Sequence, residues 1–296
     1  MFKYAAPYSW PKGYSSAAVF SADVDGESPY IWRNRGQKVE KLGEIEQRRF
    51  GPRVGLSRIL GLLDEFNIKG SFYAPAWVAK TYPEILPAIA KGGHEPAAHG
   101  YYHERVDELD EKANAEILDR TIDVFKSQLG KAPVGYRSPS WELTPAVHRC
   151  LRKRRFLYDS SLMGMDHPYS LDGLCEVPVQ WFIDDAPYFR YVGGPQDKTP
   201  PANPMQVLEA WTEEFEATRD YGGLFMITIH PWISGRGQRV RMLRRLLEHV
   251  CSTRGVWVTT AEEIARHHQR SANAKTFAMK LKLVSTDITL PKKGAR

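Results

Sequence analysis

The chain has no long apolar run and very few cysteines. No stretch of its 296 residues approaches the roughly 18 consecutive apolar residues that a membrane span needs. Residues 1–11 lack the apolar core of a signal peptide. The three cysteines, Cys150, Cys175 and Cys251, lie far apart and form no Cys-x-x-Cys pair. We therefore expect a cytoplasmic protein with no membrane partner, in which the cysteines are reduced, packed thiols.

A recognisable nucleic-acid-binding motif is also missing, although the net charge is +6. From Ser234 to the end, the chain has 14 Lys or Arg against 4 Asp or Glu, so the basic excess is confined to its last part. There Arg241, Arg244 and Arg245 alternate with apolar residues at helical spacing, which is typical of the exposed face of a packed helix. We therefore expect no nucleic-acid partner.

The remaining composition, 42% hydrophobic and 26% charged, is that of an ordinary globular protein without repeats or low-complexity segments. Strand-like runs alternate with helical patterns, and one helix is predicted between the N-cap Asp110 and the terminating Gly130. The predicted strands are residues 17–22, 70–73, 94–98, 134–137, 156–159, 175–179, 224–229 and 255–258. This alternation favours a single α/β domain with a mostly parallel sheet closed into a barrel.

Two stretches, residues 27–50 and 184–204, show no clear period. Long loops in a compact domain are usually functional lids or oligomer contacts, although plain surface insertions explain them nearly as well.

The segment that points most directly to chemistry is His99-Gly100-Tyr101-Tyr102-His103. Two imidazoles at this spacing can bind one metal ion of the zinc type, although exposed helices carry such pairs by chance. A third ligand is offered by Asp23-Val24-Asp25, because residues i and i+2 at a strand end share one face. One acid could bind metal while the other moves protons, although Asp-x-Asp-Gly is also ordinary turn chemistry.

A third segment strengthens this hypothesis. His230 directly follows the apolar run 224–229, so a further ionisable side chain is placed at a strand end. Functional residues at the ends of several strands are typical of the catalytic face of an α/β barrel or a doubly wound sheet.

Together, these segments resemble the polysaccharide deacetylase family, carbohydrate esterase family 4. The resemblance covers about residues 9–268 and rests on an ordered set of motifs: Asp23-x-Asp25-Gly26, His99-x-x-x-His103, Tyr136-Arg137-Ser138-Pro139-Ser140-Trp141, Tyr158-Asp159-Ser160-Ser161 and Ile229-His230-Pro231. The branch with peptidoglycan-deacetylase-like proteins, cyclic imide hydrolases and allantoinase-like enzymes shares further features: Trp10-Pro11, Ser161-Leu162-Met163-Gly164 and Trp181-Phe182-Ile183-Asp184-Asp185 with Pro187-Tyr188.

The resemblance implies a distorted parallel β/α (TIM-like) barrel over residues 1–270, followed by a basic tail, residues 271–296. It implies a hydrolase of non-peptide carbon–nitrogen bonds that uses one divalent metal ion, expected to be zinc. The implied metal ligands are Asp25, His99 and His103.

The resemblance also implies the catalytic roles. Asp23 would be the general base that deprotonates the attacking water, and His230 the general acid that protonates the leaving nitrogen. Arg137 would orient or charge-balance Asp23.

The first motif departs from the usual one, because Val24 separates two acids that are adjacent in most polysaccharide deacetylases. Which acid binds metal is therefore left open. Trp141, Trp181 and Tyr136 are predicted to bind substrate, and Tyr188 and Phe189 are expected near the site. For each aromatic residue taken singly, core or subunit packing is at least as good an explanation.

We expect a substrate that is a small cyclic imide, ureide or other amide, because the absence of an export signal argues against the cell wall. An N-deacetylase of amino sugars is the alternative, and a non-catalytic barrel that serves as a binding or scaffold protein is the second. A scaffold would hold no stoichiometric metal. We also expect a homo-oligomer, and catalysis that does not require the tail.

Overall fold

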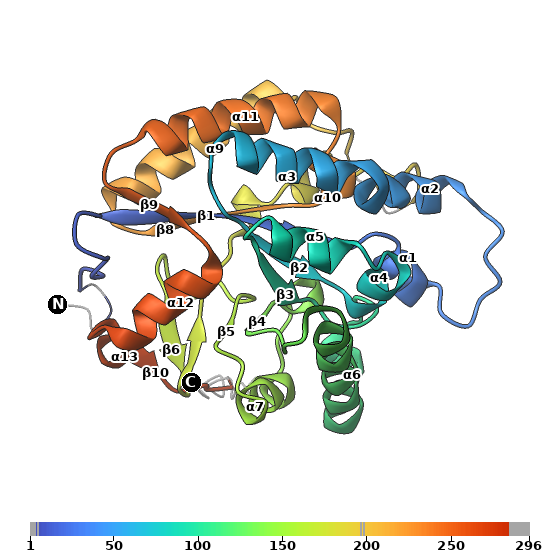
Figure 1. The fold of residues 1–296 in the computed structure, drawn as a ribbon, viewed down its shortest axis with the longest axis horizontal. Coiled ribbons are helices and arrows are strands. Elements are labelled where there is room, and N and C mark those ends of the chain that lie inside the picture. Colours follow the sequence, from blue (N-terminus) through green and yellow to red (C-terminus); the bar gives the residue numbers. More distant parts are fainter. Residues whose placement is uncertain (1–3, 5, 196, 198, 284–296) are drawn as a thin grey trace, which may run out of the picture.

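A curled, mostly parallel sheet forms the centre of the molecule (Figure 1). The structure is a computed structural model that describes residues 4, 6–195, 197 and 199–283. The strands are β1 Ser16–Asp23, β2 Ser71–Ala74, β3 Glu95–Ala98, β4 Gly135–Tyr136, β5 Tyr158–Asp159, β6 Tyr169–Leu171, β7 Leu174–Glu176, β8 Leu224–Ile229, β9 Val256–Thr259 and β10 Ala278–Met279. Their order is β10-β6-β7-β5-β4-β3-β2-β1-β8, and β9 also pairs with β1.

The sheet forms a half-barrel, as expected for a distorted β/α barrel. Among the described residues, no pairing joins the edge strands β8 and β10, so the prediction of a closed barrel is wrong. Strands β4 and β5 are only two residues long, and the antiparallel β6–β7 pair turns the far end of the sheet. These short strands do not extend the sheet far enough for β10 to pair with β8.

Helices surround this sheet, and most of them pack on its outer face (Figure 1). They are α1 Ser28–Arg33, α2 Gly43–Phe50, α3 Leu56–Glu65, α4 Ala76–Thr81, α5 Ile85–Lys91, α6 Glu111–Leu129, α7 Pro145–Lys153, α8 Ala186–Phe189, α9 Pro204–Asp220, α10 Pro231–Ser234, α11 Gly237–Ser252, α12 Ala261–Arg270 and α13 Asn273–Thr276. The helix predicted from the sequence is α6. Asp110 caps its start by accepting a hydrogen bond from Ala113 N–H at 2.7 Å, and Gly130, with φ of 71°, ends it. Among these helices, none is both long and apolar enough to cross a membrane.

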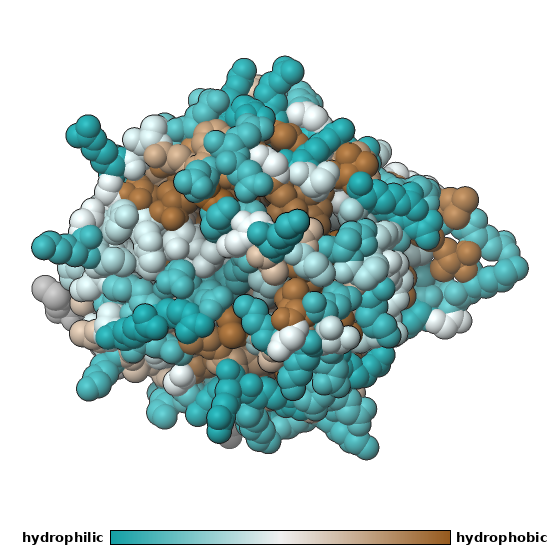
Figure 2. Space-filling view, viewed as in Figure 1, coloured by the Kyte–Doolittle hydropathy of each residue, from teal (hydrophilic) through white to brown (hydrophobic). Residues whose placement is uncertain are grey.

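The basic helix predicted from the charge pattern is α11. Its buried face includes Met242, Leu243 and Leu246, whereas Arg241 and Arg245 are exposed. The arginines therefore form the solvated face of a packed helix. On the face drawn in Figure 2, hydrophilic side chains dominate and hydrophobic ones form separate patches. Cys150, Cys175 and Cys251 are free thiols, as expected, and Cys150 and Cys175 are buried. Cys251 is exposed, so the prediction that it is packed is wrong.

Strand β1 divides the core because its side chains alternate between the two faces of the sheet. Ala18, Phe20 and Ala22 belong to the large apolar cluster under the helices. Ala17 and Val19 belong to a second cluster on the inner face. The same alternation brings Asp23 to the inner face, at the carboxyl end of the strand.

The C-terminal part of the described chain packs against the body. Phe277 is completely buried in the inner cluster, β10 pairs with β6, and the Asn273 side chain donates a hydrogen bond to Ser9 O at 2.8 Å. The packed body therefore extends to Met279, beyond the boundary that we predicted at residue 270. Residues 284–296 of the predicted tail lie outside the described residues.

Candidate active site

The predicted site residues meet at one edge of the sheet because the parallel strands end in register. His99 N–H donates to Ala74 O at 3.2 Å, and Arg137 N–H donates to Ala98 O at 2.9 Å, so each strand ends beside its neighbour. The side chains brought to this edge follow β1, β3, β4 and β8: Asp23, Asp25, His99, His103, Arg137 and His230. Carboxyl ends of parallel strands are where α/β barrels place their active sites.

Asp25, His99 and His103 form a compact group, called the triad below. One ligand atom of each lies within 4.8 Å of the others. His99 Nε2 is 3.5 Å from Asp25 Oδ1, and His103 Nε2 is 3.6 Å from Asp25 Oδ2. His99 Nδ1 hydrogen-bonds to Arg137 O at 2.8 Å, which leaves Nε2 directed at the triad. A second hydrogen bond of this kind commonly orients a metal-binding imidazole.

The electrostatics of the triad fit a divalent cation. Burial lowers the pKa of His99, and burial together with the charge of Arg48 lowers the pKa of His103 to about 3, so both rings are neutral and can bind metal. Burial raises the pKa of Asp25 although neighbouring imidazoles oppose it. Its Oδ1 has no hydrogen-bond partner among the described residues. A cation would stabilise this buried carboxylate, and two imidazoles with one carboxylate form a donor set suited to zinc.

Asp23 is held as a buried ion pair. Its Oδ1 accepts a hydrogen bond from Arg137 at 2.7 Å, and both side chains are almost completely buried. The Arg137 guanidinium also donates to Ser21 and Ser160 and lies over the Tyr73 ring at 3.8 Å. Burial alone would raise the pKa of Asp23, but Arg137 and the nearby imidazoles outweigh it and lower that pKa. Asp23 is therefore ionised.

His230 is paired with Asp185, a residue that is not among the predicted catalytic, metal-binding or substrate-binding residues. Asp185 Oδ1 is 2.7 Å from His230 Nδ1, and Oδ2 accepts from His230 N–H at 2.9 Å and from the Ser234 hydroxyl at 2.5 Å. Burial would lower the pKa of His230, but Asp185, Asp184 and Asp25 together raise it well above its ordinary value. His230 can therefore carry a proton, and its Nε2 lies 3.6 Å from Asp25 Oδ2.

A second group of possible ligands consists of Asp184, Asp185 and His230. Both Asp185 oxygens already accept hydrogen bonds, and Asp184 Oδ1 accepts from Ala186 N–H at 2.6 Å. Burial raises the pKa of Asp184 to about 8. This group is therefore less suited to a cation than the triad.

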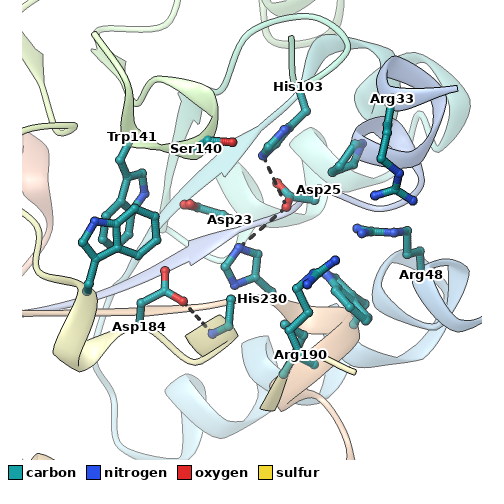
Figure 3. Close-up of a pocket in the computed structure, with 15 residues that line it drawn as sticks. Asp23, Asp25, Arg33, Arg48, His103, Ser140, Trp141, Asp184, Arg190 and His230 are labelled. Atoms are coloured by element: carbon teal, nitrogen blue, oxygen red, sulfur yellow. Dashed lines mark hydrogen bonds and ion pairs between the residues drawn. The ribbon is translucent and has the colours of Figure 1, made fainter. Parts of the chain in front are cut away.

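A cavity of about 240 Å³ opens over the triad (Figure 3). Trp141 and Trp181 line it and stack with ring centroids 4.2 Å apart. The two aperiodic stretches line it as well: residues 27–50 contribute Pro29, Arg33 and Arg48, and residues 184–204 contribute Asp184, Ala186 and Arg190. Both stretches therefore take part in the site.

Left-handed backbone conformations cluster at this cavity. His103, Ser140 and Trp141 have φ of 59°, 57° and 56°, although none is glycine. Such conformations cost energy and persist where the surrounding structure imposes them, which is common at functional sites.

The prediction for Tyr136 is wrong. Tyr136 is buried among the core residues on the helix-facing side of β4 and packs against Phe156 at 6.0 Å. The adjacent Arg137 points to the inner face, because successive strand residues alternate. Tyr188 and Phe189 also lie outside the cavity lining, with Tyr188 packed against Trp211 at 6.0 Å.

Sequence reasoning missed Asp185 as the partner of His230 and the three cavity arginines. The adjacent pair Asp184-Asp185 was visible, but no local pattern linked it to a histidine 45 residues away. The arginines come from segments without periodicity and reach the cavity only through tertiary packing.

Comparisons with known proteins identify the family of this chain. Residues 50–156 match the polysaccharide deacetylase family. A solved structure from Mycobacterium smegmatis, of a protein assigned as a polysaccharide deacetylase, is 38% identical, covers 96% of this chain and 98% of its own, and superposes with a TM-score of 0.88.

Two further relatives agree in sequence or fold. The Helicobacter pylori peptidoglycan deacetylase is 27% identical over 83% of this chain and 94% of its own length. The structure of Puue allantoinase has the same fold, with 23% identity, a TM-score of 0.78 and coverage of 89% of this chain and 93% of its own. The protein therefore belongs to the polysaccharide deacetylase family of carbon–nitrogen-bond hydrolases.

Proposed function

We propose that this protein is a metal-dependent amidohydrolase that cleaves a carbon–nitrogen bond other than a peptide bond. The observation that carries this proposal is the convergence of three units on one cavity: the triad, the ion-paired Asp23, and the His230–Asp185 pair. When bound by Asp25, His99 and His103, a divalent cation would polarise the amide carbonyl and acidify the attacking water.

Asp23 is proposed as the general base. Arg137 occupies Asp23 Oδ1, whereas Oδ2 faces the triad at 3.7 Å from His99 Nε2. The free oxygen therefore points toward the place where the attacking water would lie. Because Asp23 is ionised before the reaction, it can accept a proton.

His230 is proposed as the general acid. Asp185 accepts the hydrogen bond from Nδ1 and stabilises the imidazolium, so Nε2 remains free on the cavity side. This proton can be transferred to the nitrogen that leaves as the carbon–nitrogen bond breaks. The products of a simple amide are then a carboxylate and an amine, whereas a cyclic imide or ureide opens to one molecule that carries a carboxylate and an amide or ureido group.

We propose a small cyclic imide, ureide or amide as the substrate. The cavity of about 240 Å³ is smaller than the roughly 300–1,000 Å³ of sites for drug-sized ligands. The Trp141–Trp181 stack offers flat aromatic surface to a planar ring. The fold shared with Puue allantoinase is compatible with such a substrate but does not select it.

N-deacetylation of an amino sugar is supported equally well. The Helicobacter pylori relative is a peptidoglycan deacetylase, and tryptophan rings also stack on sugar faces. A single N-acetylated sugar ring is compatible with the size of the cavity.

We also propose the identity of the metal, the oligomeric state and the cellular location. Zinc is the expected metal because of the donor set of the triad. A homo-oligomer and a cytoplasmic location complete the proposal, and light scattering and cell fractionation test them.

A hydrolysis screen with metal added and removed tests the proposed function. The substrates are succinimide, allantoin and N-acetylated chito-oligosaccharides. Ring opening by the metal-loaded protein supports the first candidate, and acetate release from the sugars supports the second. If the protein binds no stoichiometric metal and cleaves none of them, the scaffold alternative is correct.

A further inference from the structure

One wall of the cavity carries three guanidinium groups. Arg33 lies in α1, Arg48 in α2, and Arg190 directly after α8, and all three line the cavity. Figure 3 shows them together on one side of Asp25 and His230, with Trp141 on the other side. We call Arg33, Arg48 and Arg190 the arginine wall. None of them has a role in the hydrolysis described above.

Arg48 is buried, and some of the hydrogen-bond donors of its guanidinium are unpaired within the described residues. Its side chain is 4% exposed, and its Nε donates to Glu44 Oε1 at 2.8 Å. Its guanidinium lies over the Trp232 ring at 4.7 Å from the centroid. Among the described residues, its two terminal nitrogens have no hydrogen-bond partner. Because guanidinium carries five donors, a buried arginine held in this way is prepared for an acceptor that enters the cavity.

The charges of the arginine wall are not balanced. Glu44 pairs with both Arg33, at 2.6 Å, and Arg48, at 2.8 Å. Arg190 forms no side-chain hydrogen bond or ion pair within the described part of the chain. Within the described residues, Glu44 is thus the one carboxylate that forms an ion pair with these three guanidinium groups, and the charges of Asp25 and Asp197 act on Arg48 and Arg190 without direct contact.

The other acids of the cavity do not compensate for this excess. Asp23 is paired with Arg137, Asp25 belongs to the triad, and Asp184 belongs to the group around His230. The wall therefore attracts an anion.

A structural role explains only part of this arrangement. The Arg33–Glu44–Arg48 bridge joins α1 to α2, and this accounts for Arg33 and for Nε of Arg48. It does not account for Arg190 or for the terminal nitrogens of Arg48. Both lie in the cavity that Asp25 and His103 of the triad also line.

We propose that the arginine wall is a subsite for a carboxylate group of the substrate. The inference rests on the proposed function, and it states that the hydrolysed amide is part of an anionic molecule. With the scissile carbonyl at the triad, one side of the substrate would contact the tryptophan stack and the other would present its carboxylate to the wall. Planar guanidinium groups match carboxylates through paired hydrogen bonds.

Pairs of substrates that differ by one carboxyl-bearing group test this subsite. Dihydroorotate and dihydrouracil form such a pair among cyclic ureides, as do N-acetylmuramic acid and N-acetylglucosamine among amino sugars. For the pair that the metal-loaded protein hydrolyses, we expect kcat/KM to be at least about tenfold higher for the acid, the scale of a hydrogen bond to a charged group. A wild-type protein without this preference overturns the subsite.

Variants of Arg190 assign the preference to the wall. Arg190→Gln should lower the ratio of acid to neutral kcat/KM about tenfold, and Arg190→Lys, which keeps the charge without the fork, should lower it less. The matched control is Arg53→Gln, because Arg53 is exposed, pairs with Glu46 at 2.8 Å and lies outside the cavity lining. A ratio that is equal in Arg190→Gln and Arg53→Gln contradicts the assignment.

A binding measurement separates this inference from the proposed function. The screen of succinimide, allantoin and chito-oligosaccharides decides the proposed function, and if neither pair above is hydrolysed, calorimetry with glutarate and butyrate still tests the subsite without turnover. Glutarate has a second carboxylate, so we expect it to bind the metal-loaded protein at least about tenfold more tightly, and Arg190→Gln should remove the difference. Equal binding of the two acids by the wild-type protein overturns the subsite, whatever the turnover.

Discussion

Replacement of Asp185 by asparagine tests the role of His230 most closely. Three donors converge on the Asp185 carboxylate: His230 Nδ1 on Oδ1, and His230 N–H and the Ser234 hydroxyl on Oδ2. Asparagine has only one oxygen. If this oxygen accepts from His230 N–H and Ser234, the amide NH₂ group faces Nδ1. The imidazole then loses both its acceptor and the negative charge that stabilises its protonated form.

The expected defect is large and selective. Loss of general-acid catalysis lowers turnover by roughly 10²–10⁴-fold, whereas metal content should not change, because Asp185 is outside the triad. The defect should be confined to substrates whose leaving group needs a proton. We therefore expect hydrolysis of the amide to show the full loss, and hydrolysis of a phenyl ester of the same acid to fall by less than about tenfold.

Elemental analysis and steady-state kinetics on the two substrates make this measurement. Ser234→Ala is the matched control, since it removes one hydrogen bond to Asp185 but keeps the charge, and it should change amide turnover by less than about tenfold. The reasoning is refuted if Asp185→Asn impairs amide and ester equally. It is also refuted if the variant loses its metal, which would move the cation to the Asp184–Asp185–His230 group.

Three further predictions follow from other parts of the structure. Asp23→Asn should keep its metal and lose roughly a hundredfold or more of turnover; metal loss measured by elemental analysis would instead make Asp23 a ligand. Burial raises the pKa of Glu95 from 4.5 to about 7, so the folded state binds the proton of this carboxyl more tightly than the unfolded state does. The free energy of unfolding should therefore fall by on the order of 3 kcal/mol as pH rises from about 4.5 to 7. Urea titrations should find this fall absent in Glu95→Gln, and an unchanged pH profile would contradict the assignment. Truncation after Arg270 removes the buried Phe277 and should lower the melting temperature by several degrees. Equal melting temperatures of the truncated and the full chain would show that the packing of Phe277 contributes nothing.

The strands were predictable where their apolar runs are long. Strand β8 has the bounds Leu224–Ile229, which are those predicted, and β1 differs by one residue at each end. The hairpin of β6 and β7 was only half predicted, since the predicted strands include the second strand of the pair and omit the first. Its turn is Asp172-Gly173, with φ of 45° and 88°, and Asp-Gly between apolar residues is a strong hairpin signal. The flanking strands, however, are three residues long, too short to show a period.

The site was predictable to the extent that its residues stand at strand ends. Asp23, His99 and His230 each follow an apolar run directly, and Asp25 lies two residues beyond Asp23. These positions alone place them at one edge of a parallel sheet. Arg48 has no such signal. It reaches the cavity because residues 51–55, which extend α2, pack against α10. Gly55 lies so close to Pro231 that any side chain at position 55 would collide with Pro231 O. This contact depends on tertiary packing, and no sequence pattern in residues 27–50 predicts it.

The central claim is that the triad holds one divalent cation on which hydrolysis depends. Elemental analysis of the wild-type protein and of the His99→Ala, His103→Ala double variant, combined with turnover before and after chelation, tests it most directly. We predict about one divalent ion per chain in the wild type, none in the double variant, and turnover that disappears on chelation and returns when metal is added. His249→Ala, a change of a histidine remote from the cavity lining, should keep both metal and turnover. Unchanged metal occupancy in the double variant, or full turnover by the chelated wild-type protein, would contradict the claim.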